Sequence, residues 1–351
     1  MVVVYVASSE PYSGKTLTCT VLGLRWQRQG RRVGYLRPLG VMPVRVGGEL
    51  ADEDAVFVAK QLKLDTPISQ LCPVLLGPDM CHADPEALRK KLQESFRAAS
   101  QGKDIMLLNG TGAVISRGSM VGLDGASVVE MLNASAVLVA RCNSFLEVDG
   151  ILAAQRLLGK HLAGVILNRV SIHQREEIEN HVVPCLGGRG VRVLGLLPED
   201  SVLHSVSVSE LAEATAAEAL SGTEAMDQLV ENFVVGAMSV EGALRYFRRT
   251  PRKCVITGGD RSDIQLAALE TPTRCLILTG GMRPSHTVLA RAQERRVPVL
   301  LVSGDTLSTV GIIDELVGKL RIRDPNKIEH AVHQFEQHLD LAQLDTVLGL
   351  V

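Results

Sequence analysis

Three consecutive residues whose types suit phosphate binding, Gly14-Lys15-Thr16, stand between a short apolar run and a longer amphipathic one. Val2–Val6 before them is typical of a strand, and Leu17–Trp26 after them has the periodicity of a helix. Where a strand turns into a helix, free backbone N–H groups and the helix dipole attract anions. A lysine there can reach terminal phosphates, and a threonine hydroxyl can bind Mg²⁺. The pattern predicts a phosphate-binding loop over Ser8–Thr16, with Ser13 also at the nucleotide.

Two charged positions further along the chain could complete such a site. Arg37 follows the apolar run Val33–Leu36, and an arginine beyond a strand end can hold a phosphate or carboxylate bidentately. Asp54 lies in Asp52-Glu53-Asp54 at the start of an expected helix, where it could be a Mg²⁺ ligand. Simpler interpretations stay open for both positions: a surface arginine before a turn, and acids that complement a helix dipole.

Asparagines follow two other expected strands. Asn109 and Gly110 come after Ile105–Leu108, and the glycine would let a ligand approach the backbone closely. Asn109 is neutral and therefore a weak Mg²⁺ ligand, whereas a carboxylate here would make a convincing metal site. Asn168 comes after Ala163–Leu167 and could read a purine edge through its amide. The alternatives are a glycine-rich turn at the first position and a plain turn at the second.

The second half of the chain has two glycine-rich corners, each between an expected strand and an expected helix. The first includes Gly259, Asp260 and Arg261, and the second is Thr279-Gly280-Gly281. Side by side they would form an anion or nucleotide pocket, whereas separately they are two ordinary tight turns.

Short β-branched runs alternate with longer helical patterns along the chain, which indicates parallel sheets with crossover helices. The predicted fold class is α/β: a doubly wound, mostly parallel sheet followed by a smaller α/β domain. A shift in composition after Pro198 suggests the boundaries. We expect a nucleotide-binding domain over residues 1–200, a connection over 201–222, a second domain over 223–325, and a helical tail over 326–351.

Composition argues against several classes of protein. The chain has 351 residues and a formal net charge of −2, so it lacks the basic excess typical of nucleic-acid-binding proteins. No apolar run reaches the ~18 residues that a membrane helix needs, and Met1 leads directly into a strand rather than a secretory leader. The seven cysteines include no CxxC pair and predict a reducing, cytoplasmic location.

The order and spacing of several segments resemble the dethiobiotin synthetase and cobyrinic acid a,c-diamide synthase group of P-loop proteins. The likeness extends to the synthetase-like N-terminal domain of large bacterial phosphotransacetylases. The second half resembles the DRTGG domain that accompanies it there, through its two glycine-rich corners. The segments that carry the first resemblance are Gly14-Lys15-Thr16, Arg37-Pro38, Asp52–Ala55, Asn109–Gly112, Gly122–Ala126, Gly164–Arg169 and Gly195–Pro198.

This resemblance implies ATP and Mg²⁺ as cofactors and a homodimer or higher homo-oligomer as the assembly. Lys15 and Thr16 would contact phosphate and metal, and Asp54 would be a second metal ligand. Asn168 and Pro198 would hold the adenine. The DRTGG domain would bind a second effector.

Three departures from the synthetase pattern bear on activity. The loop-opening glycine is Ser8, a lysine that helps activate substrate is Arg37, and the carboxylate after the third strand is Asn109. Loss of a metal ligand and of that lysine should slow phosphoryl transfer about 10²-fold or more. We therefore predict an ATP–Mg²⁺-binding regulatory protein, in which Lys15 and Arg37 would be the catalytic residues if any reaction takes place.

Other functions stay open from the sequence. One alternative is a weak ATPase or an ATP-dependent ligase that activates a carboxylate. Another is a non-catalytic accessory subunit of an acetyl-phosphate enzyme. Because no acetyltransferase domain follows in this sequence, phosphotransacetylase activity of the chain by itself is not expected.

Overall fold

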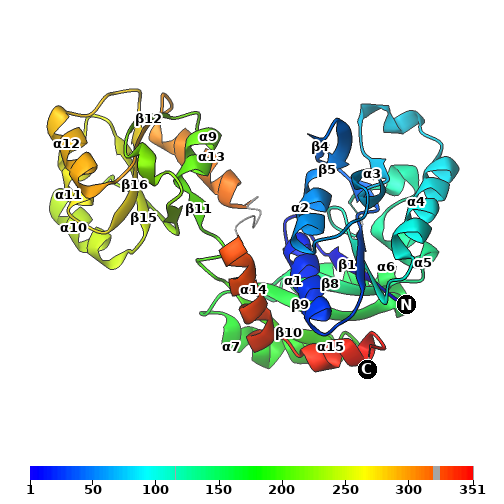
Figure 1. The fold of residues 1–351 in the computed structure, drawn as a ribbon. Helices are drawn as coiled ribbons and strands as arrows, with labels where there is room; N and C mark the ends of the chain where they lie inside the picture. Colours follow the sequence, from blue (N-terminus) through cyan, green and yellow to red (C-terminus); the bar gives the residue numbers. More distant parts are fainter. Residues whose placement is uncertain (115, 319–324, 351) are drawn as a thin grey trace. The chain divides into compact units, whose positions relative to one another are not determined.

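The computed structural model describes residues 1–114, 116–318 and 325–350, and the chain divides into two units (Figure 1). Unit 1 contains Met1–Glu199 together with two C-terminal helices, and unit 2 is drawn from Asp200–Arg321. Each unit is built around its own parallel sheet, so the predicted α/β class is confirmed.

The sheet of unit 1 has six strands in the order β10-β9-β8-β1-β7-β2, and every neighbouring pair is parallel. Its central strands are buried on both faces, which explains their uninterrupted apolar sequences. The order reverses beside β1, so the chain is doubly wound as predicted, with a topological switch point between β1 and β8. The strands are β1 (Val2–Ser8), β2 (Val33–Leu36), β7 (Ile105–Asn109), β8 (Ser135–Arg141), β9 (Leu162–Val170) and β10 (Val193–Pro198).

Helices connect these strands and flank the sheet (Figure 1). Three of them begin at an aspartate whose side chain accepts backbone N–H groups of the first turn: Asp52, Asp84 and Asp124. The helices are α1 (Lys15–Arg28), α2 (Glu53–Gln61), α3 (Ile68–Leu71), α4 (Pro85–Ser100), α5 (Gly125–Met131) and α6 (Glu147–Leu158), with short 3₁₀ turns η1 (Pro78–His82), η2 (Ser119–Val121) and η3 (Gly159–His161).

Parts of unit 1 differ from the sequence prediction. The helical segment after β9 is a composite of α7 (Arg175–Glu177), the π-helix η4 (Ile178–Val182) and α8 (Val183–Gly187), whose irregularity no sequence pattern predicted. Pro184 explains the irregularity, since it has no N–H for an α-helical hydrogen bond. Two small sheets were also not predicted because their strands are very short: β3 (Leu39–Gly40) with β6 (Val74–Leu75), and β4 (Pro43–Val46) with β5 (Glu49–Asp52).

The C-terminal residues, expected as a separate tail, are instead part of unit 1. They form α14 (Pro325–His338) and α15 (Leu341–Val347), and α14 packs on α1 and on β10 (Figure 1). The backbone N–H of Asp340 donates to the carbonyl of Leu194 at 2.8 Å. Gly195 has φ of 147°, and a Cβ there would lie 2.2 Å from the carbonyl oxygen of His338, so the close approach requires glycine.

Unit 2 has a five-stranded sheet in the order β12-β17-β16-β15-β14, in which only the edge strand β12 is antiparallel. Its four parallel strands therefore end at one edge. The strands are β12 (Glu218–Ser221), β14 (Asn232–Val235), β15 (Lys253–Gly258), β16 (Thr273–Thr279) and β17 (Val299–Leu301), and the helices are α10 (Val240–Arg249), α11 (Ser262–Leu269), α12 (His286–Arg295) and α13 (Thr306–Gly318).

The stretch 201–222, expected as a connection, is ordered structure within unit 2. It contains β11 (Val206–Ser207), α9 (Val208–Ala214) and the edge strand β12, and β11 pairs with β13 (Leu229–Val230). A capping box between Ser207 and Glu210 starts α9. Its small Ala and Ser residues resemble a linker in composition, but Val208 and Leu211 are buried in the core of this unit. One further 3₁₀ turn is η5 (Thr223–Ala225).

Candidate functional site

The N-terminus of α1 keeps its backbone N–H groups available for a ligand. It begins after Gly14, and neither a capping side chain nor an acidic residue occupies its first turn. This contrasts with α2, α4 and α5, where an aspartate takes that role. The loop before α1 follows β1 at the topological switch point, where doubly wound sheets bind ligands. An uncapped helix start at this place is an anion-binding arrangement.

Glycine is required at position 14. Its φ is 103°, and a Cβ would lie 2.7 Å from Nδ2 of Asn168. That Nδ2 donates to the carbonyl of Ser13 at 2.8 Å, while Oδ1 of Asn168 accepts from the backbone N–H of Arg169 at 2.9 Å. The predicted adenine-reading residue is thus engaged with the loop itself, at both ends of its amide. Pro198, its predicted companion, ends β10 and pairs with Val170 of β9.

Lys15 is folded back over the loop and is only 8% exposed. Its Nζ donates to Oγ of Ser8 at 2.7 Å, and that oxygen lies 2.6 Å from the carbonyl oxygen of Glu10. Ser13 Oγ also donates to the Glu10 carbonyl, at 2.9 Å. Burial, assisted by the charge of Arg37, lowers the pKa of Lys15 to about 8. Ser8 therefore replaces the usual glycine with a hydrogen-bond acceptor for the loop lysine.

Arg37 is 4% exposed and lies between two carboxylates. Its Nε is 3.0 Å from Oδ1 of Asp52, and its Nη1 is 3.0 Å from Oδ2 of Asp54. Burial acts to lower the pKa of Arg37, but the charges of Asp54 and Asp52 outweigh it and raise that pKa above its ordinary value. The arginine is therefore a permanent buried cation in the site, rather than a free arm at the surface.

Asp52 is a buried position beside the candidate site that sequence reasoning did not select. It is fully buried, and its carboxylate accepts four backbone N–H groups, from Val41, Met42, Asp54 and Ala55. The same carboxylate faces Arg37, so a helix cap also fixes the position of the arginine. An aspartate directly before an expected helix was the available signal.

Asn109 lies beside Thr16, as the motif spacing implied, but presents the nitrogen of its amide. Nδ2 donates to Oγ1 of Thr16 at 3.2 Å and to the hydroxyl of Tyr35 at 3.1 Å. Its Oδ1 is buried without a hydrogen-bond partner. The next residue is glycine, and a Cβ on Gly110 would lie only 2.8 Å from the carbonyl oxygen of Val6, so the close approach favours glycine there.

The donor set does not fit the predicted Mg²⁺ site. Mg²⁺ is usually bound by one or two carboxylates with phosphates and waters, yet Asp54 is paired with Arg37 and Thr16 faces an amide N–H. Across residues 1–114, 116–318 and 325–350, no group of three or more His, Cys, Asp or Glu side chains is arranged to hold a metal. The structure thus brings Thr16 together with Asn109, and Asp54 together with Arg37, without forming a divalent-cation site.

The two glycine-rich corners of unit 2 pack against each other. The backbone N–H of Gly259 donates to the carbonyl of Thr279 at 3.1 Å, and a Cβ on Gly259 would lie 1.9 Å from the carbonyl oxygen of Met282. Gly280 and Gly281 have φ of 82° and 66° and donate to the carbonyls of Gly304 and Val302. Close backbone packing therefore accounts for Gly259, and the positive φ accounts for Gly280 and Gly281.

The charged residues of the first corner also have partners. Arg261 pairs with Asp263 at 3.0 Å and donates to the Met238 carbonyl, while Asp260 is exposed. Gln265, which sequence reasoning missed, is fully buried and donates to the carbonyls of Gly258 and Gly259. These contacts stabilise the corner from inside unit 2.

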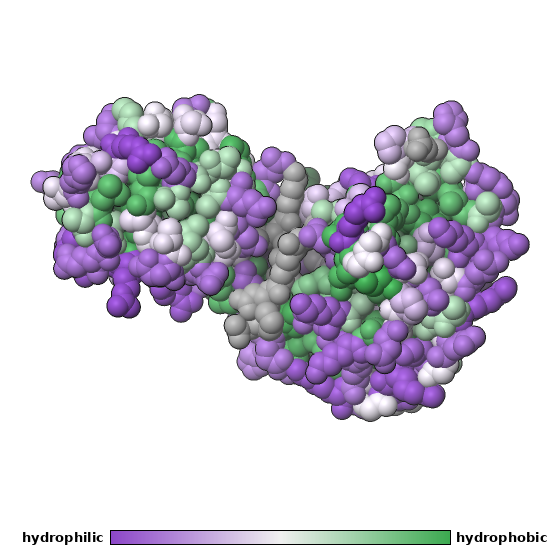
Figure 2. All heavy atoms as spheres, turned by 45° about the horizontal axis from the view of Figure 1, so that its top comes forward, coloured by the Kyte–Doolittle hydropathy of each residue, from purple (hydrophilic) through white to green (hydrophobic). Residues whose placement is uncertain are grey.

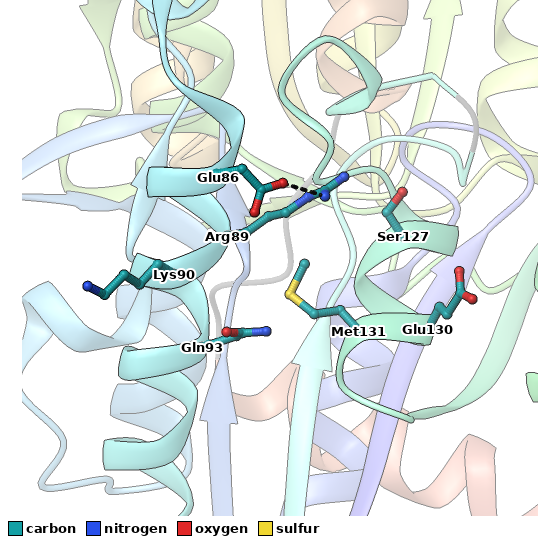
Figure 3. Close-up of a pocket in the computed structure, with 7 residues that line it drawn as sticks. All are labelled: Glu86, Arg89, Lys90, Gln93, Ser127, Glu130 and Met131. Atoms are coloured by element: carbon teal, nitrogen blue, oxygen red, sulfur yellow. Dashed lines mark hydrogen bonds and ion pairs between the residues drawn. The ribbon is translucent and has the colours of Figure 1, made fainter.

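A separate groove of about 370 Å³ lies between α4 and α5 (Figure 3). Glu86, Arg89 and Lys90 line its α4 side, and the Glu86 and Arg89 side chains pair at 2.9 Å. Ser127 and Glu130 line the α5 side. Its acids and bases offset one another, and none of the predicted site residues lines it.

No helix in the described part of the chain is both long and apolar enough to span a membrane. Hydrophilic residues cover much of the face seen in Figure 2, with hydrophobic residues between them. Some large apolar side chains are exposed near the phosphate loop: Tyr12 in the loop itself, Phe145 and Leu146 after β8, and Ile172 after β9.

Comparisons with known proteins agree with this two-part architecture. The AAA domain model matches residues 3–207, and the DRTGG domain model matches residues 210–316. The chain is 25% identical over 376 residues to a phosphate acetyltransferase of Nitratidesulfovibrio vulgaris, covering 98% of this chain and 51% of that protein. It is 25% identical over 356 residues to a phosphate acetyltransferase of Synechocystis sp., covering 96% and 50%. The chain thus spans about half the length of the curated relatives it matches.

Solved structures give more distant likenesses. The MinD cell division protein of Aquifex aeolicus matches with a TM-score of 0.35 and 17% identity, covering 57% of this chain and 83% of that chain. The CBS and DRTGG domains of the Clostridium perfringens pyrophosphatase regulatory region match with a TM-score of 0.30 and 20% identity, covering 41% and 70%. The resemblance to the N-terminal part of phosphotransacetylases is confirmed by the family and relative matches. The chain belongs to the AAA domain family, with its P-loop domain followed by a DRTGG domain.

Proposed function

We propose that this protein is a nucleotide-binding regulatory protein whose loop Ser8–Thr16 holds the phosphates of ATP or a related nucleotide. The observation that carries the proposal is the start of α1, which has neither a side-chain cap nor an acid and has Lys15 buried beside it. Aspartate caps α2, α4 and α5 of the same unit, and acidic residues stand in the first turn of α6, whereas the long helix α1 has neither feature.

Regulation rather than phosphoryl transfer is favoured by the polar groups around the loop. Asn109 stands beside Thr16 in place of a carboxylate, so negative charge that would hold a catalytic metal is missing. Arg37 is committed to Asp52 and Asp54 and is buried, which speaks against a role in activating a substrate carboxylate. Activity as an ATP-dependent ligase would require the side chains of Asn109 and Arg37 to rearrange.

Isothermal titration with ATP, ADP and GTP tests the proposal directly. We expect binding with a dissociation constant of about 1 mM or tighter. Lys15→Ala should weaken it about tenfold or more, since it removes a charged donor from the phosphate site. Lys60→Ala changes an exposed lysine on α2 and is the matched control. Absence of binding at millimolar nucleotide, or equal affinity in both variants, would contradict the proposal.

As part of the same proposal, the protein is a cytoplasmic homodimer that associates through the loop edge of unit 1. The exposed apolar side chains of Tyr12, Phe145, Leu146 and Ile172 support this, because they belong to loops after the neighbouring strands β1, β8 and β9. Seven free cysteines agree with a reducing compartment. Light scattering after size-exclusion chromatography measures the mass, and Leu146→Asp should yield monomers. A wild-type monomer at micromolar concentration would reject the dimer.

Unit 2 would carry the regulatory response in this proposal, by binding a second small effector. Support for this comes from the DRTGG match alone. Equilibrium dialysis of nucleotides with the Lys15→Ala variant tests it, because binding that survives this change must lie outside the phosphate loop.

A further inference from the structure

The site around α1 has a buried cation nearby, Arg37, whose charge acts on the loop lysine Lys15. Arg37 is buried, and each of its two contacts is a carboxylate oxygen at 3.0 Å. One of these carboxylates, Asp54, is the residue that the motif offers to Mg²⁺. The other, Asp52, is fixed by four backbone N–H groups and cannot turn toward a ligand without losing them.

We propose that the Ser8–Thr16 loop binds its phosphate ligand without a divalent cation, and that the Arg37 guanidinium supplies the positive charge in its place. This inference rests on the proposed nucleotide binding and concerns the same site. Its ligand is a metal-free phosphate anion, such as the β-phosphate of an uncomplexed nucleotide.

The hydroxyl of Thr16 supports the inference independently of Arg37. In a metal-binding loop that oxygen faces the cation, whereas here it accepts a hydrogen bond from Nδ2 of Asn109. Tyr35 accepts from the same Nδ2 at 3.1 Å. Burial raises the pKa of Tyr35, so its hydroxyl remains neutral. The neighbour of Thr16 is therefore a hydrogen-bond donor without charge, which repels rather than attracts a cation.

Charge balance agrees with this arrangement. Lys15 and Arg37 are the cations next to the loop, and Asp52 and Asp54 offset them without a further carboxylate from Asn109. Because these four charges balance, the site keeps no excess negative charge to attract a divalent cation beside Asp54. A phosphate anion would instead be attracted by both cations and by the N-terminus of α1.

Titration calorimetry with ATP in millimolar Mg²⁺ and in excess EDTA tests the inference on the full chain. We expect the two dissociation constants to agree within about threefold. Binding that is about tenfold or more tighter with Mg²⁺ would overturn the inference and leave the proposed function intact. Absence of binding in both buffers would reject the proposed function itself.

Two variants sharpen the test. Asn109→Asp places a carboxylate beside Thr16 and should create a Mg²⁺ requirement, with binding about tenfold tighter in Mg²⁺ than in EDTA. An Asn109→Asp protein that stays indifferent to Mg²⁺ would contradict the role given to this amide. Arg37→Met should weaken binding in EDTA about tenfold or more, whereas Arg45→Met changes an exposed arginine of β4 and should not. If Arg37→Met does not fold, as judged by circular dichroism, the comparison of wild type with Asn109→Asp decides.

Discussion

Replacing Asp345 by alanine should loosen the C-terminal helices from α1, and the contacts allow the effect to be calculated. Its carboxylate accepts hydrogen bonds from Nη1 and Nη2 of Arg25 at 2.8 and 2.6 Å, and from Nε1 of Trp26 at 3.0 Å. The Arg25 and Asp345 side chains are only 15% and 13% exposed, so water screens the pair weakly.

The expected loss in the free energy of unfolding of unit 1 is about 3 kcal/mol. A hydrogen bond to a charged group contributes roughly 1.5–3 kcal/mol, and the three bonds are not additive because they share one carboxylate. Removal of Asp345 also leaves Arg25 without its partner in a partly buried place. The Arg28–Glu329 pair, which joins α1 to α14, gives the contrast. Its side chains are 49% and 68% exposed, so Glu329→Ala should cost only about 0–1 kcal/mol.

Urea unfolding followed by tryptophan fluorescence measures both variants. Trp26 is the one tryptophan of the sequence and is fully buried, so the signal reports unit 1. Burial acts to raise the pKa of Asp345, but the hydrogen bonds from Arg25 and Trp26 outweigh it and lower that pKa. The stabilisation is therefore present above the ordinary carboxyl pKa of about 4, and is lost as the pH falls through the lower folded-state value. Equal losses for Asp345→Ala and Glu329→Ala, or a loss that persists unchanged at low pH, would refute this reasoning.

Three further results are expected. Gly259→Ala should destabilise unit 2 by about 3 kcal/mol or more, because the new Cβ meets the carbonyl of Met282 at 1.9 Å; differential scanning calorimetry measures it, with Gly311→Ala, whose Cβ would meet nothing within 4 Å beyond its own stretch of helix, as a control that should not destabilise. Nucleotide affinity should fall as the pH rises through about 8, since Lys15 loses its proton there; titration calorimetry in the Lys15→Arg variant should show no such fall below pH ~10. Asp52→Ala should lower the melting temperature of unit 1 by an amount equivalent to about 3 kcal/mol, because four backbone N–H groups lose their acceptor and Arg37 loses an ion-pair partner; a shift no larger than that of the exposed Glu49→Ala would contradict it.

Local patterns predicted most of the fold, because fully buried parallel strands have continuous apolar sequences that are easy to recognise. Val2–Val6 and Ile105–Leu108 became the centre of the first sheet as expected. The misses have specific causes. The capping box Ser207–Glu210 is a local signal for α9 that was read as linker composition. The docking of α15 on α1 depends on Asp345 meeting Arg25, residues 320 positions apart, and no local pattern contains that information.

The site was predicted in part for the same reason. The motif Gly14-Lys15-Thr16 predicted a loop between a strand and a helix, and the structure has that loop between β1 and α1. The direction in which a side chain turns is decided by its neighbours. Asn109 was expected as a weak ligand, but its amide nitrogen donates to Thr16 and to Tyr35. The pairing of Asp54 with Arg37 likewise requires Asp52 to anchor the arginine.

The return of the chain to unit 1 through α14 has a consequence for biosynthesis. Unit 2 is one continuous stretch, whereas unit 1 is completed by residues that the ribosome adds after unit 2. As the chain emerges, unit 2 can finish folding first, while α1 and β10 still lack the helices that cover them. Translation that stops after unit 2 and before α14 would leave Trp26 and its surroundings uncovered. Such an incomplete chain would expose apolar surface of the kind that chaperones recognise.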